Sequence, residues 1–167
     1  EVIHLRLTAQ REFPLSAIHA GFKSGAKGAH SSRTLMFDDL VSVLAATGPT
    51  ADRAHYISAI TESNCLGKPT ASTRRLSAQR LSELYALDPI VPMFRVFRRL
   101  WDLDREGRRV LALLFALARD PLLAATTASV VSLPVGAEFH RDAVRRALRE
   151  VVGDRFNLST LDKVLRN

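Results

Sequence analysis

Two clusters of basic and hydroxyl side chains are the parts of this sequence best suited to chemistry, and the first lies in its middle. It is the run Ser72-Thr73-Arg74-Arg75, followed by Arg80 on the same predicted helix. The free N–H groups of a helix start, together with hydroxyls and arginines, suit the binding of a phosphate group. An equally good alternative is a solvated helix face whose arginines pair with acids on neighbouring turns.

The second cluster closes the chain. Its polar side chains that could reach a base edge or a phosphate are Ser159, Thr160, Lys163, Arg166 and Asn167. Arg can form paired hydrogen bonds with guanine, and Asn can form them with adenine. The pattern predicts a helix that reads DNA, and the alternative is an ordinary helical hairpin with a polar outer face.

A pair of helices is needed to position these C-terminal residues. The first begins near Phe139, and its apolar side chains recur every three or four residues up to Gly153, where a left-handed backbone costs little. Ser159 or Asn157 caps the second. Two helices joined by so short a turn are typical of a helix-turn-helix, whose second helix can enter the major groove. In the first helix we expect His140, Val144, Ala147, Leu148 and Val151 on one face, with His140 at the helix surface, and Arg141, Arg145 and Arg149 on the other faces.

The sequence predicts only helices between Thr34 and this pair. They are Thr34–Ala46, a helix capped by Thr50 and running to Glu62, one opened by Ser72 or Thr73 and stopped by Asp88-Pro89, one from Pro92, then Glu106–Arg119 and Pro121–Val131. Their expected inward residues include Leu40, Tyr56, Ile60, Leu76, Leu81, Leu84, Tyr85, Phe94, Phe97, Leu100 and Trp101, whereas Arg95, Arg98 and Arg99 are expected outside. Because Val110–Ala118 is apolar nearly all round, Glu106–Arg119 is predicted to be the central core helix.

These elements predict three domains. Residues 1–31 form a flexible or weakly structured arm, with a short strand around Val2–Leu7 and basic side chains such as Lys23 that could touch phosphates. Residues 32–66 form a helical pair, and residues 67–167 form a helical domain that ends in the helix-turn-helix. The chain stops at Asn167 within a predicted helix, so we expect a truncated C-terminus.

Composition narrows the class of partner and the compartment. The 167 residues carry a net charge of +7, which favours nucleic acid first and an anionic membrane or an acidic protein second. A genome rich in G and C would explain the many Arg and Ala residues equally well. The single cysteine, Cys65, excludes an intrachain disulfide and indicates a reducing compartment. The longest apolar run, Val110–Ala118, is far shorter than the roughly 20 residues of a membrane span, so we expect a cytoplasmic protein that makes no use of a membrane.

Catalytic and metal motifs are missing from the sequence. The segment Gly21–Gly28 lacks the Gly-Lys-Ser/Thr ending of a phosphate-binding loop. The histidines form no His-x-x-x-His pair, and one cysteine cannot build a zinc ribbon. Ser, His and Asp occur in no order typical of a nucleophilic triad. We therefore predict no catalytic residue, no metal and no cofactor.

Three short motifs resemble the BrxA family of bacterial BREX phage-defence systems. They are Ser72-Thr73-Arg74-Arg75, the pair Arg80-Leu81 followed by Leu84, and the late run Leu158–Val164. The resemblance spans roughly residues 68–167 and implies a winged-helix-like unit that binds duplex DNA without catalysis, beside a methyltransferase and other defence subunits. It also implies that Arg74, Arg75, Lys163 and Arg166 contact the DNA.

Together these observations predict an all-α helical bundle with a C-terminal helix-turn-helix or winged-helix-like unit. The predicted function is that of a non-enzymatic protein that binds double-stranded DNA in a phage-defence or regulatory complex. The alternative is a helical adaptor or scaffold subunit that docks a protein partner in a larger complex, and a further one is an accessory domain of a longer enzyme.

Overall fold

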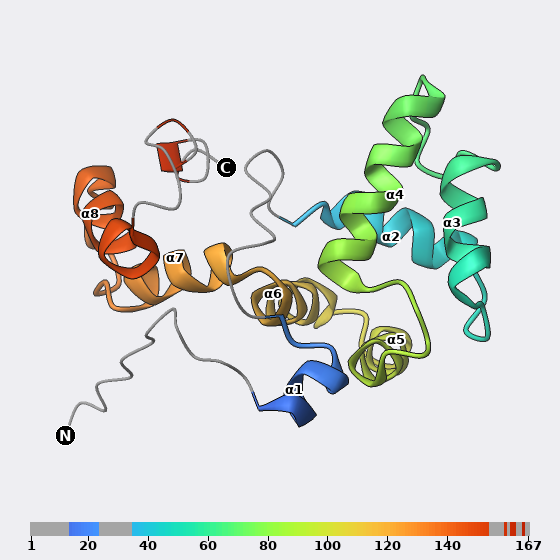
Figure 1. Ribbon diagram of the computed structural model, residues 1–167, viewed down its shortest axis with the longest axis horizontal. Coiled ribbons are helices and arrows are strands. Elements are labelled where there is room, and N and C mark those ends of the chain that lie inside the picture. The colour runs from blue at the N-terminus through green and yellow to red at the C-terminus, as the bar shows by residue number, and fades with distance from the viewer. Residues whose placement is uncertain (1–13, 24–34, 154–158, 160, 163–164, 166–167) are drawn as a thin grey trace.

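The computed structural model describes residues 14–23, 35–153, 159, 161–162 and 165. In these parts of the chain every regular element is a helix, which confirms the all-α prediction (Figure 1). The helices are α1 (Leu15–Ala20), α2 (Phe37–Ala46), α3 (Arg53–Thr61), α4 (Ala71–Tyr85), α5 (Pro92–Leu103), α6 (Arg108–Arg119), α7 (Pro121–Val131) and α8 (Arg141–Val152). The strand expected near Val2–Leu7 lies outside the described residues.

Side-chain caps fix where three of these helices begin. The Asp52 carboxylate accepts the His55 N–H at 2.9 Å and caps α3. The Thr70 hydroxyl accepts the Thr73 N–H at 3.1 Å and caps α4. Asp120 caps α7, as the sequence predicted. The predicted caps, Thr50 for α3 and Ser72 or Thr73 for α4, were wrong. Each of these helices begins with a capping box, in which the side chains of the cap residue and of the third helical residue each bond to the other residue's backbone N–H.

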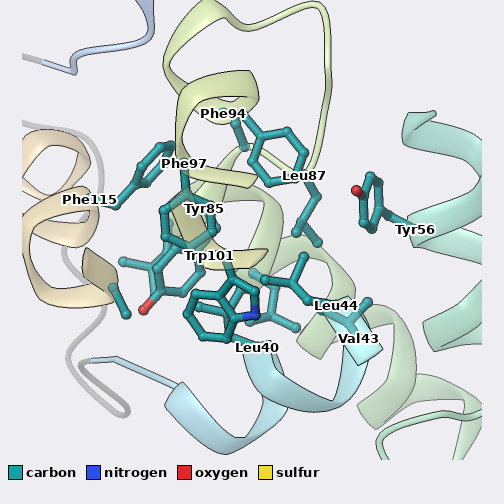
Figure 2. Packing of buried hydrophobic residues seen from close by; sticks show 14 of the residues in the cluster. Leu40, Val43, Leu44, Tyr56, Tyr85, Leu87, Phe94, Phe97, Trp101 and Phe115 are labelled. Carbon is teal, nitrogen blue, oxygen red and sulfur yellow. The ribbon is translucent and has the colours of Figure 1, made fainter. Parts of the chain in front are cut away.

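One aromatic core joins α2 to α6. Phe97 of α5 lies at its centre, with its ring centroid 4.7 Å from that of Phe115, 5.5 Å from that of Trp101 and 5.9 Å from that of Tyr85 (Figure 2). Offset and edge-on ring contacts at these distances add to the stabilisation that comes from burial alone. Leu40 of α2 and Ile60 of α3 are fully buried in the same cluster, so residues of the expected N-terminal pair share this core with α4–α6.

Most expected inward residues of this body are buried, and two are not. Leu40, Tyr56, Ile60, Leu81, Leu84, Tyr85, Phe94, Phe97 and Trp101 are each at most 2% exposed. Leu76 and Leu100 are each 44% exposed, which contradicts the prediction. Leu76 lies five residues before Leu81, which turns it about 140° around the helix axis and away from the core.

Helix α6 lies between the α2–α5 helices and the α7–α8 pair (Figure 1). Its inward face holds Ala112, Phe115 and Ala116, which are buried. Its opposite face holds Val110 and Leu114, which are 60% and 58% exposed. The helix is therefore a core element on one face only, although its sequence is apolar on both.

Helices α7 and α8 contact each other, and aliphatic residues outside the aromatic core are buried in this part of the chain. Val144 and Leu148 of α8 are buried, as expected, and Leu161 is fully buried. His140, expected at the helix surface, is exposed, and it lies just before α8 as its N-cap residue. After Gly153, the described residues 159, 161 and 162 are helical. A helix-turn-helix or a wing remains a prediction, because most residues of the connecting turn and of the second helix lie outside the described part.

Part of the expected N-terminal arm is folded onto the body. Helix α1 contacts α5 and ends at Gly21, whose φ of 118° suits glycine. A Cβ atom at Gly21 would lie 2.6 Å from Cγ1 of Val91, so the close approach of this segment to the start of α5 also requires glycine. The Lys23 N–H then donates to the Ala118 carbonyl of α6 at 3.0 Å.

Candidate nucleic-acid interface

A basic groove lies between α3 and α4, and we call it the α3–α4 groove. It has a volume of 680 Å³, and Lys23 and the last residue of α6 also line it. Its charged side chains are Lys23, Arg53, Arg75, Glu83 and Arg119. Four cations and one carboxylate make the groove a positively charged surface that suits an anion.

The inner end of the groove is built from a helix C-terminus. The last carbonyls of α4 lack partners within the helix and need outside donors. Arg119 supplies them, with Nε 3.1 Å from the Glu83 carbonyl and Nη2 3.5 Å from the Ser82 carbonyl, while Nη1 reaches the Gly21 carbonyl at 2.6 Å. The Lys23 Nζ donates to the same Glu83 carbonyl at 3.1 Å.

Burial shifts the titration of these two cations. It lowers the pKa of Arg119 from 12.5 to about 10, so the guanidinium stays charged at neutral pH. The pKa of Lys23 is also lowered, first by burial and then by the neighbouring charge of Arg119. Both side chains are therefore structural caps that also contribute positive potential to the groove.

The outer part of the groove offers cations that are open to solvent. Arg75 is exposed and forms no hydrogen bond or ion pair with any described residue. The Arg53 side chain is 61% exposed, and its Nη1 lies 3.8 Å from Oδ2 of Asp88, a loose pairing. Two guanidinium groups on facing helices can thus turn toward an anion that enters the groove.

The structure separates the three arginines that the sequence grouped on α4. Only Arg75 lines the groove. At 100° per residue, Arg74 points about 100° to one side of Arg75 and Arg80 about 140° to the other. Arg74 is half-buried, and its Nε is buried without a hydrogen bond. The three predicted contact residues therefore do not form one surface.

The start of α4 is also less open than a phosphate clamp requires. The Thr73 N–H is already bonded to the Thr70 hydroxyl, and the Arg74 N–H donates to the Thr70 carbonyl. Ser72 is exposed on the first turn. One amide of this helix start, that of Thr73, is therefore taken by the cap and is not available to a phosphate.

Arg98 was expected to be exposed, but its exposed fraction is only 9%. Its Nη2 donates to the Leu44 and Thr47 carbonyls, each at 3.3 Å, and its Nη1 pairs with Asp102 at 2.9 Å. The C-terminus of α2 ends against α5, and its orphan carbonyls are satisfied by this guanidinium. Arg95 and Arg99 are exposed, as predicted.

The C-terminal cluster is described only in part. Ser159 is exposed, whereas the positions of Thr160, Lys163, Arg166 and Asn167 lie outside the described residues. Arg141 and Arg149 of α8 are exposed, as expected. Arg145 lies instead between two acids, with Nη1 2.8 Å from Asp142 and Nη2 2.8 Å from Asp162. Arg145 therefore joins α8 to the helical stretch that follows.

Two of the groove's basic residues, Arg53 and Arg119, were not among the residues expected to contact phosphate or DNA. Lys23 had a signal in the sequence, because it is a basic residue in an arm with hydroxyl and glycine neighbours. Arg53 and Arg119 had none, because each follows an ordinary helical pattern. Only the packing of α3 beside α4, and of the α6 end against α4, brings them together (Figure 1).

Among the described residues, no group of three or more His, Cys, Asp or Glu side chains could hold a metal ion. No single described helix has the length and apolar composition to cross a membrane, and α6 and α7 reach that standard only when taken together across a bend of 114°. No protein-family model matches the chain, and no curated protein or solved structure matches it.

Proposed function

We propose that this protein binds double-stranded DNA without catalysing a reaction, and that the α3–α4 groove holds part of the phosphate backbone. The observation that carries the proposal is the meeting of Lys23, Arg53, Arg75 and Arg119 around one concavity with a single carboxylate. Phosphate contacts fix a protein on a duplex, and arginine is well suited to them because its planar donors match two phosphate oxygens.

The groove contains two kinds of cation, which have different roles in this proposal. Lys23 and Arg119 are held by backbone carbonyls and set the potential of the inner end. Arg53 and Arg75 are exposed on the rim and would form the direct contacts. A surface whose inner charges are fixed before the ligand arrives loses little side-chain freedom on binding.

Base reading belongs, in this proposal, to the C-terminal residues Ser159, Thr160, Lys163, Arg166 and Asn167. Arg141 and Arg149 on the exposed side of α8 would add phosphate contacts near them. The resemblance to BrxA supports a place in a phage-defence complex in the cytoplasm, with other defence subunits as neighbours. Arg74 and Arg80, which face away from the groove, would contribute through long-range charge.

The test is fluorescence anisotropy with a duplex of random sequence at two salt concentrations. We expect affinity to fall steeply with salt, because each neutralised phosphate releases counterions. Arg53→Glu combined with Arg75→Glu should weaken binding by about tenfold or more and flatten the salt slope by about two phosphate contacts.

The matched control is Arg105→Glu, which makes the same change of charge at an exposed position in the loop between α5 and α6. It should lower affinity much less than Arg75→Glu does. Equal losses in both variants would assign the binding to net charge rather than to the groove. Wild-type protein that binds no duplex at low salt would remove the proposal.

A second candidate function, the helical adaptor, is favoured by apolar side chains left exposed on α5 and α6. Val96 and Leu103 on α5 are 59% and 72% exposed, and Val110 and Leu114 on α6 are similarly open. Exposed apolar surface of this kind is typical of protein contacts. A subunit that co-purifies with the wild type but not with Leu103→Glu, together with no salt-dependent DNA binding, would favour the adaptor.

A further inference from the structure

The outer face of α4 lies beside the α3–α4 groove and carries side chains of the kinds that read base edges. The buried residues of α4 begin only at Ser77, and Figure 1 shows the half of the helix before it at the edge of the molecule. Exposed residues recur in this half, and in the next turn, at a spacing of three or four: Ser72, Arg75, Leu76 and Gln79. Residues at this spacing lie on one side of a helix, so these four form one surface that faces solvent.

Cations lie at both edges of this surface. Arg75 is at the edge that meets the groove, which Arg53 of α3 also lines. At 100° per residue, Gln79 and Leu76 lie about 40° and about 100° around the helix axis from Arg75. Arg80 lies further in the same direction, at about 140° from Arg75. Uncharged side chains in the middle and arginines at the edges suit a helix in a DNA groove, because the base edges there lie between two phosphate backbones.

Gln79 is held in a position that suits the reading of adenine. Its Nε2 donates to Oε1 of Glu83, one turn further along α4, at 3.0 Å. This bond fixes the side-chain amide and uses one of its two N–H groups. The other N–H and the Gln79 Oε1 form no hydrogen bond with a described residue. In the major groove, adenine offers N7 as an acceptor and N6 as a donor, and one amide can bond to both.

Leu76 supplies an apolar contact next to this amide. It is 44% exposed, although it lies between polar side chains on the outer face of the helix. The C5 methyl group of thymine projects into the major groove, on the strand opposite the adenine of the same base pair. Contact with this methyl group would remove apolar surface of both partners from water. Gln79 and Leu76 therefore match the two members of A·T base pairs.

From these features we propose that α4 enters the major groove and reads A·T base pairs, with Gln79 on adenine and Leu76 on the thymine methyl group. The major groove is about 12 Å wide and admits an α-helix. Arg53 and Arg75 then contact the phosphate backbone of one strand, and Arg80 places positive charge toward the other. The inference rests on the proposed DNA binding and adds α4 to the C-terminal residues as a second base-reading element.

Selection of binding sites from a pool of DNA duplexes of random sequence tests the inference. We expect the wild type to enrich sites with A·T pairs at fixed positions, and Gln79→Ala to lose about tenfold of the preference for adenine at one of them. Leu76→Ala should keep that preference. In the selected duplex, replacement of thymine by uracil, which lacks the C5 methyl group, should weaken binding of the wild type several-fold and that of Leu76→Ala hardly at all. The matched control is Leu103→Ala, at an exposed leucine of α5, which should behave as the wild type does.

Affinity for random duplex separates this inference from the proposal on which it rests. Gln79→Ala changes no charge, so its affinity for random duplex should stay within about twofold of the wild type, unlike that of Arg53→Glu combined with Arg75→Glu. Binding of the pool without enrichment of any sequence would overturn base reading by α4 and leave the DNA proposal intact. Sequence preferences that stay unchanged in both Gln79→Ala and Leu76→Ala would also overturn it. Absence of any duplex binding at low salt would remove both proposals.

Discussion

The body formed by α2–α6 uses several arginines to satisfy helix C-termini, whereas no described arginine of α8 is recorded in that role. In the body, arginines satisfy helix C-termini: Arg98 does so for α2, Arg119 for α4 and Arg108, whose Nε lies 2.8 Å from the Trp101 carbonyl, for α5. On α8, Arg141 and Arg149 are exposed. The net charge of the chain therefore overstates how positive its surface is, because some of its arginines are used to satisfy backbone carbonyls within the fold.

The two regions also differ in their cores. The body packs Tyr, Phe and Trp rings around Phe97. The buried hydrophobic residues of α7, α8 and the described residues that follow are Leu122, Ala125, Val144, Leu148 and Leu161, and none of them is aromatic. Aromatic residues bury more area per residue, so the body should be the more stable of the two regions.

The largest expected effect tests this difference in stability. Phe97→Ala should lower the free energy of unfolding by about 4 kcal/mol, because it leaves a cavity at the centre of the aromatic cluster. Leu148→Ala should cost about 3 kcal/mol in the smaller core. Urea denaturation measures both values.

Hydrogen exchange sharpens the same comparison. In Leu148→Ala, amides of α8 should exchange much faster while those of α4 and α5 keep their protection. In Phe97→Ala, protection should be lost throughout α2–α6. Equal loss of protection in both regions in both variants would show that the two cores unfold as one unit.

The next effect concerns the structural arginines. Arg119→Met keeps much of the apolar stem but leaves the Gly21 and Ser82 carbonyls without their charged donor and the Glu83 carbonyl with Lys23 alone, so unfolding should become easier by about 3 kcal/mol. Arg146→Met, at an exposed position on α8, should change stability by less than about 0.5 kcal/mol. Thermal and urea unfolding measure the difference, and similar values for the two variants would break the contrast drawn above.

The smallest effect is a pH dependence that arises from Lys23. Its pKa in the folded protein is below the ordinary value of 10.5, chiefly because of burial and then because of Arg119. The unfolded chain therefore binds this proton more tightly, and stability gains a contribution as pH rises through the folded pKa toward 10.5. Lys23→Gln should remove that contribution.

The measurement is the difference in unfolding free energy between wild type and Lys23→Gln across the alkaline range. Taking this difference removes the contributions of Tyr56 and Tyr85, whose raised pKa values change stability with pH in the opposite direction. A wild-type curve that falls relative to the variant as pH rises toward 10.5 would contradict the stated sign.

Helix identity followed from local patterns that the chain carries by itself. Asp120 followed by Pro121 predicted the start of α7, and the spacing of Phe94, Phe97 and Trp101 predicted the inward face of α5. These signals are local because a cap or a helix face depends on residues within one or two turns. Arg75 was likewise identified from its place on α4, and the groove that it lines was not.

The wrong predictions about which residues are buried share one physical reason. Arg98 repeats the polar side of an amphipathic helix, yet the C-terminus of α2 ends beside it and takes its donors. Val110 and Leu114 look like core residues, yet no described helix covers them. A sequence pattern cannot predict which distant segment packs against a given helix face, since that depends on the packing of all the helices together.

Thus the amino-acid sequence by itself determined an all-α chain with a positive charge and the inward faces of most of its helices. Only the tertiary structure decided which cations serve the fold and which face solvent, because orphan carbonyls at helix ends attract arginines from far along the chain. The same packing made the α3–α4 groove from Lys23, Arg53, Arg75 and Arg119, whose positions in the sequence have no local relation.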